Sequence, residues 1–300
     1  MQKRKHYANP ITTNDMLIND IKTFVSFIPT AQRFNPDEEL SDMDTLKPFL
    51  EESETKIINE IIGSDLFDAI IASTNTTIQD ALKRIVAINA YYLCIPFVDL
   101  ISTPNGFAVV SSTNNIAPAS KERVERLLDW VKLRLSESTD ALIILLLSGT
   151  DNMFREEWKK SVHFERYTNC LFITAGDLRR FGRSNASRNT LDELYPLLIS
   201  YQGDMSNTVS FEYMKELIEN RRSDKLTKYD EDVFYKLQVV LGLYSKEKVN
   251  QGKELLGTIV NQMIADKDNY TTFMTSQAYK IKTSENYVNQ KTDQTFMFNP

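Results

Sequence analysis

Residue types that can do covalent chemistry are scarce in this chain. Two histidines and two cysteines occur among 300 residues, and the one close pair is His163 with Cys170. A thiol enzyme needs such a pair in contact, with an Asn or Asp to orient the imidazole, and Asn169 and Asp177 lie nearby in the sequence. Because the members of such sites are usually distant in sequence, a structural role for both side chains is the favoured interpretation. A hydrolase remains a third hypothesis that requires the two side chains within hydrogen-bond reach in a cleft.

Other patterns of site chemistry are also missing. The histidines and cysteines do not have the spacing of zinc ligands. Acidic residues gather at 51–54 and 156–157, where helices are expected to face water, and no acid pair of the glycosidase kind can be recognised there. Gly242, Gly252 and Gly257 lie in helical sequence and form no phosphate-binding loop. The sequence therefore predicts no catalytic residue, no metal site and no cofactor.

Composition limits the class of protein further. The net charge of −6 argues against a nucleic-acid-binding protein with a broadly basic surface. Two cysteines are too few for a disulfide framework and fit a reducing compartment. The basic start is followed by no apolar signal core, and the longest apolar run, 141–147, is far shorter than the roughly 20 residues of a membrane span. We expect a soluble protein that is neither secreted nor inserted in a membrane.

One apolar pattern occurs twice, about 145 residues apart. The matched segments are 27–28 with 172–173, 44–46 with 189–191 and, after a three-residue insertion, 48–50 with 196–198. The apolar residues Ile57, Ile61, Leu66 and Ile70 then correspond to Met205, Val209, Met214 and Ile218. A duplicated packing unit with divergent polar residues is typical of a scaffold rather than of a single asymmetric active site.

The spacing of apolar residues predicts the elements that carry this pattern. Three- and four-residue spacing indicates helices near 15–25, 44–70, 78–101, 120–147, 174–182, 190–203, 210–222, 229–245 and 247–266. Turn residues at 103–106 and a short β run at 107–110 predict a β-hairpin or strand-loop over 103–118. The predicted fold class is mainly α, with two related helical-bundle units, a small β-hairpin insertion and an extended C-terminal arm.

The same patterns give the predicted domain boundaries. Residues 1–14 form a flexible N-terminal arm, 15–168 the first helical unit, 169–266 the second helical unit and 267–300 the extended C-terminal arm. The first unit is expected to contain the β insertion.

Loops at equivalent places in the two copies carry opposite charge. Asp37, Glu38, Glu39 and Asp42 belong to the first, and Arg179, Arg180, Arg183 and Arg188 to the second. Two solvated loops are the simplest interpretation. The sharper hypothesis is a head-to-tail contact in which the acidic loop of one subunit meets the arginine loop of the next, which closes into a ring when the rotation permits. Contact between these arginines and DNA phosphates is a weaker alternative because the chain is acidic.

The C-terminal segment is the second candidate for contact between chains. It is rich in Thr, Asn and Gln, and simple disorder is the plain interpretation. The alternative is an arm that becomes ordered against a neighbouring chain, with Tyr279, Tyr287, Phe296 and Phe298 as anchors.

Residues 105–124, NGFAVVSSTNNIAPASKERV, give the chain a family resemblance. With the helices on either side, Phe154, Trp158 and the run LFITAGDLRRF at 171–181, they resemble head-to-tail connector proteins of tailed bacteriophages of Bacteroides-type hosts, the crAss-like group. The resemblance covers roughly residues 15–220 and is most specific at 105–124.

This resemblance implies a structural virion protein made in the host cytoplasm and located at the head–tail junction. Such an α-helical adaptor forms a ring, commonly of twelve copies, under the portal protein, extends the DNA channel and provides a docking surface for the tail or for further rings. DNA would pass without sequence-specific binding through a lumen that the acidic chain helps to keep non-adhesive, and no membrane is involved. The alternative is a non-virion helical chaperone or scaffold that acts during assembly.

Overall fold

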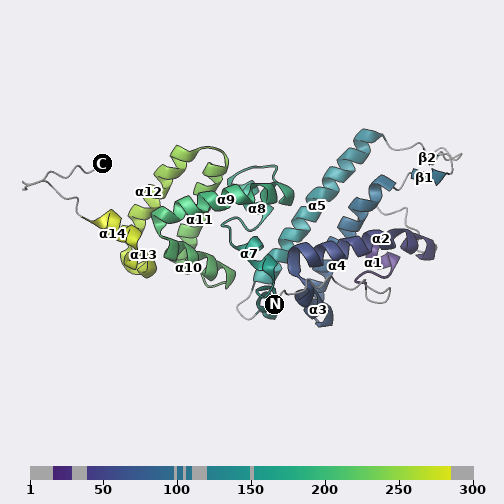
Figure 1. Ribbon diagram of the computed structural model, residues 1–300, viewed down its shortest axis with the longest axis horizontal. Coiled ribbons are helices and arrows are strands. Elements are labelled where there is room, and N and C mark those ends of the chain that lie inside the picture. Colours follow the sequence, from purple (N-terminus) through teal and green to yellow (C-terminus); the bar gives the residue numbers. More distant parts are fainter. Residues whose placement is uncertain are drawn as a thin grey trace, which may run out of the picture. The chain divides into compact units, whose positions relative to one another are not determined.

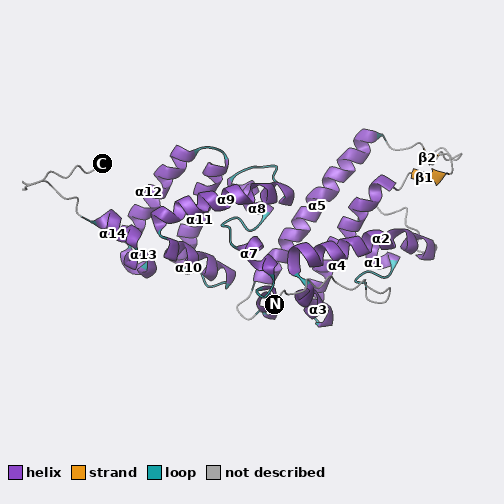
Figure 2. Cartoon of the chain, in the orientation of Figure 1, coloured by secondary structure: helices purple, strands orange, loops and turns teal. Residues whose placement is uncertain are grey.

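The computed structural model describes residues 16–28, 39–97, 100–103, 106–109, 120–148 and 152–284, and these are mainly helical, as predicted (Figures 1 and 2). The α-helices are α1 (Ile21–Ser26), α2 (Glu39–Ile57), α3 (Ser64–Ala72), α4 (Thr76–Cys94), α5 (Lys121–Leu147), α6 (Met153–Trp158), α7 (Val162–Thr168), α8 (Ala175–Phe181), α9 (Arg188–Val209), α10 (Phe211–Arg222), α11 (Lys228–Ser245), α12 (Val249–Ala265), α13 (Thr271–Thr275) and α14 (Gln277–Thr283). Short π or 3₁₀ turns are η2 (Ile58–Ile62), η3 (Ile95–Phe97) and η4 (Lys267–Asn269). Among the described helices, none is long and apolar enough to cross a membrane.

The chain divides into two compact units, as expected, but at a different place. The first unit comprises residues 1–180 and 184–194, and the second comprises 181–183 and 195–300. The predicted boundary after residue 168 is therefore wrong, and so is the predicted end of the second unit at 266. Residues 169–180 belong to the first unit because Leu171, Phe172 and Ile173 are buried and α8 is bonded to α5 through Asp140.

A β-hairpin interrupts the helices, as predicted, but it starts earlier. Strands β1 (Leu100–Thr103) and β2 (Gly106–Val109) pair antiparallel, with Leu100 opposite Val109. The hairpin connects α4 to α5, which run side by side (Figure 1). Residues 110–118 of the predicted insertion lie outside the described residues.

The duplicated sequence pattern corresponds to a duplicated succession of helices. In each copy a long helix contains a proline on its exposed face, Pro48 in α2 and Pro196 in α9. A residue with positive φ then separates it from a shorter helix: Gly63 at 83° before α3 and Ser210 at 85° before α10. Two long helices follow in both copies, α4 with α5 and α11 with α12. The first copy is one residue longer than the second between its proline and its residue with positive φ. The π turn η2, just before Gly63, accommodates that extra residue.

The core of the first unit is built around Trp158. This side chain is fully buried, and its indole Nε1–H donates to the carbonyl of Ile61 at 2.9 Å. Ile61 lies at the end of η2, where helix carbonyls lack partners within the helix, so the bond satisfies two polar groups at once. Phe164 and Tyr167 of α7 pack on the Trp158 ring. The aromatic stretch 153–168 thus forms two helices, α6 and α7, that complete this core.

The core of the second unit extends into the predicted arm. Helix α11 packs on α12, and α10 packs on α13. Tyr270 and Phe273 are buried and stack on Tyr213 of α10. The prediction of an extended arm from residue 267 is therefore wrong for residues 267–283, because these aromatic side chains find apolar cover on α10. Residues 285–300 lie outside the described residues.

Residues 16–20 are extended instead of helical and lie against α2. The backbone N–H of Leu17 donates to Oε1 of the buried Glu54 at 2.7 Å, while Oε2 has no hydrogen-bond partner within the described part of the chain. Burial raises the pKa of Glu54 to about 7, with a further increase from the nearby charge of Glu51 and an opposing effect of the Leu17 bond. A neutral carboxyl therefore fits this site better than a carboxylate.

We expect the stability of the first unit to depend on pH through Glu54. The folded-state pKa of about 7 lies above the ordinary value of 4.5, so the stabilisation is complete below about pH 4.5 and is lost as pH rises through 7. The variant Glu54→Gln keeps an acceptor for Leu17 and should remove this loss, which amounts to about 1–3 kcal/mol at pH 8. Urea unfolding at pH 5 and pH 8, followed by tryptophan fluorescence, measures it. The exposed Glu52→Gln on the same helix is the control, and an equal pH response of Glu54→Gln and the unmodified chain would contradict the expectation.

Candidate functional site: a buried polar junction

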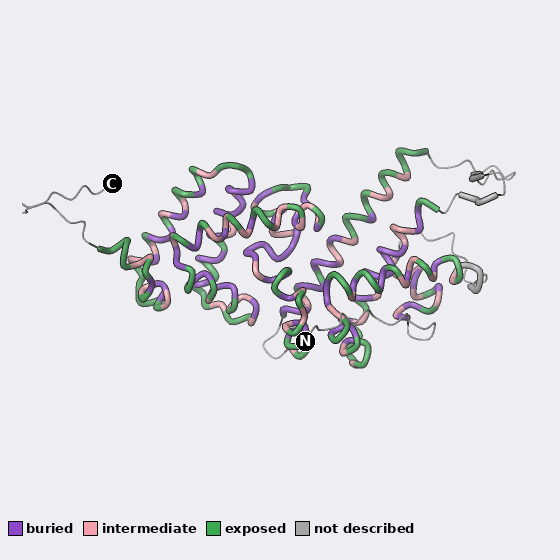
Figure 3. The backbone as a smooth tube through the Cα atoms, viewed as in Figure 1, coloured by how far each residue is buried: buried purple, intermediate pink, exposed green. Residues whose placement is uncertain are grey.

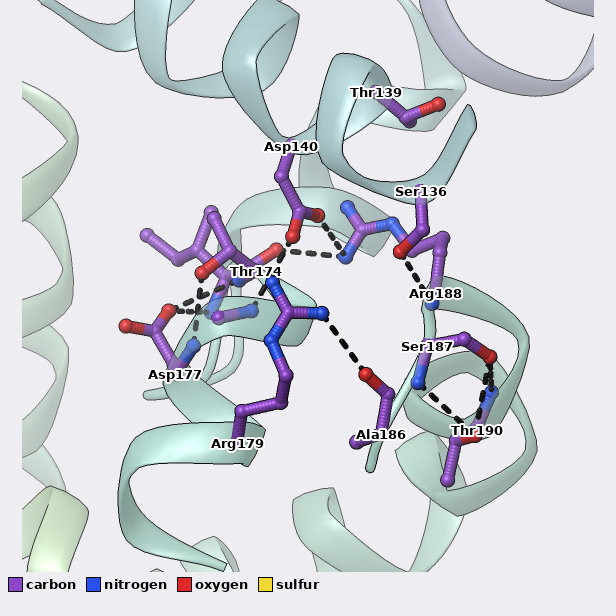
Figure 4. A network of polar contacts seen from close by, with 12 residues as sticks. Ser136, Thr139, Asp140, Thr174, Asp177, Arg179, Ala186, Ser187, Arg188 and Thr190 are labelled. Carbon is purple, nitrogen blue, oxygen red and sulfur yellow. Dashed lines mark hydrogen bonds and ion pairs between the residues drawn. The ribbon is translucent and has the colours of Figure 1, made fainter. Parts of the chain in front are cut away.

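The most concentrated polar chemistry of the described residues is a buried junction within the first unit (Figure 4). It joins the middle of α5, the segment 173–177 at the start of α8, and residues 186–190 at the start of α9. Asp140 and Arg188 lie at its centre, and each side chain is about 9 % exposed. These residues come from three places in the sequence that no local pattern connects.

Arg188 makes most of the contacts. Its Nη1 donates to the carbonyl of Ile173 at 2.8 Å and lies 3.6 Å from Oδ1 of Asp140. Its backbone N–H donates to Oγ of Ser136 at 2.8 Å, and its guanidinium carbon lies 5.0 Å from the centre of the Tyr167 ring. Its Nε and Nη2 are buried and have no hydrogen-bond partner among the residues that the structure describes. One arginine thus ties the first residue of α9 to α5, α7 and the segment before α8.

Asp140 completes the junction from α5. Its Oδ2 accepts a hydrogen bond from the backbone N–H of Gly176 at 3.3 Å. Burial raises the pKa of Asp140, and the positive charge of Arg188 and the backbone donors near α8 act in the opposite direction. Because desolvation and ion pairing oppose each other, the pair fixes the geometry of the junction more than it adds net stability.

The starts of α8 and α9 are both capped by reciprocal bonds. Asp177 Oδ2 accepts from the backbone N–H of Thr174 at 2.9 Å, and Thr174 Oγ1 accepts from that of Asp177 at 3.0 Å. Ser187 and Thr190 exchange the same kind of bonds at the start of α9. These bonds satisfy backbone donors that the helices leave free, so both helix starts are closed off.

The junction lacks the parts of an active site. Asp140 and Arg188 are paired with each other and largely buried, and an arginine guanidinium stays protonated, so it cannot act as a general base. Tyr167 also has a raised pKa because of burial, which keeps its hydroxyl protonated. The arrangement can hold three segments in register, and we assign it that role.

The sequence-predicted arginines occupy quite different environments. Arg188 is buried in the junction, so it cannot belong to an exposed subunit interface as predicted. Arg179 is half-buried, and its Nη1 donates to the carbonyl of Ala186 at 2.9 Å. Arg180 and Arg183 are exposed, and Nη2 of Arg183 reaches the carbonyl of Ser245 at 3.5 Å. Of the four, only Arg180 and Arg183 present their side chains to solvent.

The predicted acidic loop is in part helical. Glu39 and Asp42 belong to the first turn of α2, where negative residues are favoured by the helix dipole, so the expected helix start after Asp44 is wrong. Asp37 and Glu38 lie outside the described residues. The contact of these acidic residues with a neighbouring subunit stays a prediction.

Of the predicted arm anchors, the structure describes only Tyr279. Its ring stacks edge-on against Phe273 at 5.6 Å within the second unit. This residue therefore has a contact inside its own chain, and its role as an anchor on a neighbour stays a prediction. Tyr287, Phe296 and Phe298 lie outside the described residues.

The His163–Cys170 hypothesis has no geometric support. Cys170 is buried, and burial raises the pKa of its thiol to about 12, which disfavours the thiolate that a nucleophile needs. His163 lies on α7, where partial burial and Arg166 lower its pKa. In the described part of the chain, no group of histidine, cysteine or acidic residues could hold a metal ion.

Sequence reasoning missed the central pair of the junction. Asp140 immediately precedes the most apolar run of the chain, and a lone acid in the buried half of a helix was the available signal. Its partner, 48 residues later, could not be inferred without the tertiary structure.

Comparison with known proteins gives one partial match. Residues 42–168 are similar to a family of unknown function, DUF6712. The matched part runs from α2 to the last residue of α7 and covers less than half of the chain. No curated protein and no solved structure matches the chain. The class that the fold defines is therefore a two-unit, mainly α-helical protein, one part of which resembles that family.

We expect Arg188→Met to lower the free energy of unfolding of the first unit by about 3 kcal/mol, because it leaves Asp140 buried without its partner. The double variant Arg188→Met/Asp140→Leu should recover much of this loss, since both charges are then removed. Chemical denaturation followed by tryptophan fluorescence measures the coupling.

Arg183→Met is the matched control, because Arg183 is exposed. Equal effects of the Arg188 and Arg183 substitutions, or additive effects in the double variant, would show that the buried pair does not hold the junction.

Proposed function

We propose that this chain is a structural virion protein, a head-to-tail connector ring that extends the portal channel and provides a docking surface for the tail. Support comes from three kinds of observation: the resemblance at residues 105–124, the scaffold character of the fold, and the distribution of exposed apolar side chains. The resemblance suggests the specific role. The scaffold character and the exposed apolar side chains agree with a protein that binds other subunits.

The exposed apolar residues along α5 carry the proposal. Trp130, Leu133 and Ile144 are 37 %, 41 % and 52 % exposed on this one helix. Figure 3 shows that the outer half of α5 is mostly exposed or half-buried, whereas its last turns are largely buried. Trp130 and Leu133 lie one turn apart on this helix, so their exposed apolar area is available for a partner to cover.

Helices α4 and α5 contribute to the main core and also share a small apolar cluster that is separate from it. Ile88, Ile95 and Val131 form this cluster, with half-buried residues such as Leu127 and Leu128 beside them. The hairpin lies between these helices in sequence, and the most specific part of the resemblance spans β2 and the start of α5. Helices α4 and α5 with the hairpin between them are therefore suited to contact a neighbouring subunit or an adjoining ring.

The alternative function is a helical chaperone or scaffold that binds partners during assembly and leaves before the particle is complete. The same exposed apolar face of α5 would serve it. Mass spectrometry of purified particles separates the two, since only a connector remains in the virion in a fixed number of copies.

We expect the purified chain to form a closed ring. Twelve copies of 34.6 kDa give a mass of roughly 415 kDa, which mass photometry resolves from a monomer and which negative-stain electron microscopy should show as a ring. A protein that stays at 34.6 kDa over a wide range of concentration and salt would contradict the ring.

Reversal of charge at Arg180 and Arg183 tests the head-to-tail contact. Arg180→Glu/Arg183→Glu should weaken assembly at least tenfold at low salt, because both side chains are exposed and would face the acidic residues of the next subunit. The dissociation concentration from light scattering measures the effect, and added salt should reduce it. Lys253→Glu, exposed on α12, is the control; assembly that is unchanged in the double variant refutes this contact.

A further inference from the structure

A groove of about 780 Å³ lies along α4 and α5 in the first unit. One wall is α5, where Trp130 is partly exposed and Arg134 stacks over its ring at 5.3 Å. The opposite wall includes Arg84 of α4, which stacks over Phe27 at 5.8 Å. The groove is thus bordered by two pairs of an arginine and an aromatic ring.

The chemistry of the groove favours aromatic side chains over ions. Arg134 is already paired with Glu137 at 3.1 Å, and the guanidinium carbon of Arg84 lies 5.8 Å from the centre of the Phe27 ring. Buried Val131 and Ile88 lie between the walls and provide an apolar floor. Planar guanidinium groups and aromatic faces accept further aromatic rings by stacking, so a segment that carries phenylalanines among polar residues is the matching ligand.

Such a segment lies in the last part of the second unit. Residues 285–300 contain Tyr287, Phe296, Met297 and Phe298 among mainly polar residues, too few to form a core. They follow α14, whose Ile281 is 64 % exposed. Sixteen residues can extend over about 50 Å, enough to reach another molecule in contact with the second unit.

We infer that the groove binds residues 285–300 of a second copy of this chain, with Phe296 and Phe298 inserted next to Trp130. This inference rests on the proposed ring. A head-to-tail ring needs two different surfaces that meet at every contact, and here the groove belongs to the first unit and the segment to the second. The segment then links each subunit to the next by anchor residues in a groove.

Tryptophan fluorescence gives a direct test, because the chain has two tryptophans and Trp158 is fully buried. The acceptor is the full chain with Phe296→Ser/Phe298→Ser, whose own segment is disabled. A synthetic peptide of residues 284–300 is titrated onto it. We expect a saturable change in Trp130 emission, with at least tenfold weaker binding for a peptide that carries the same two serines.

Three acceptor variants, made in the same background, locate the binding. Trp130→Phe should abolish the signal, which assigns it to the groove. Ala141→Arg places a long side chain in the groove at an exposed position of α5 and should block binding. Asp129→Arg, exposed on the same helix but outside the groove, is its matched control and should bind normally. No saturable change with the native peptide, or equal binding by the Ala141→Arg and Asp129→Arg variants, overturns the inference.

The outcome also separates this inference from the proposed function. A ring that forms with unchanged mass and dissociation concentration in the full-chain Phe296→Ser/Phe298→Ser variant overturns the inference and leaves the ring intact. A chain that binds the peptide in the groove yet never assembles supports the groove and overturns the ring. A Trp130 emission difference between the native chain and this variant that persists unchanged on dilution of a monomer indicates binding within one chain, and it overturns the second-copy assignment.

Discussion

The buried pair of Asp140 and Arg188 is the constraint on which the organisation of the first unit depends. A charge removed from water is tolerated only next to an opposite charge or hydrogen-bond partners, so neither residue can be placed without the other. Through this pair the middle of α5, the segment before α8 and the first residue of α9 are fixed in one arrangement. The start of α9 is thereby held in the first unit, while the same helix continues as the first long helix of the second.

This constraint also explains how the two copies of the repeat depend on each other. Each copy has a proline-containing helix, a residue with positive φ, a shorter helix and two long helices. The spacing of apolar residues recurs in both copies, and it makes the helices of each copy pack in a similar way. The polar residues diverge, and one of them, Arg188, serves the first unit from the beginning of the second copy.

The surface complements this interior. The groove along α4 and α5, the exposed side chains of α5, and Arg180 and Arg183 at and just after the end of α8 all lie outside the buried junction, so contacts can form there without a cost to the core. Burial keeps the Cys170 thiol protonated, and the helix caps of α8 and α9 satisfy the backbone donors at the polar junction. This division between a closed polar junction and open apolar and charged surfaces agrees with the proposed connector role.

The sequence by itself determined the helical class, most helix positions after residue 120, the hairpin between α4 and α5, and the apolar register of the repeat. These follow from periodicity and turn residues, which act over a few neighbours. The tertiary structure alone decided that residues 169–180 belong to the first unit, that Arg188 is buried while Arg180 and Arg183 are exposed, and that residues 267–283 are helical and fold back. Each of these depends on partners distant in the chain: Asp140 for Arg188, and Tyr213 for Tyr270 and Phe273. Local spacing carries no information about such partners, because burial is a property of the packed molecule and not of the segment.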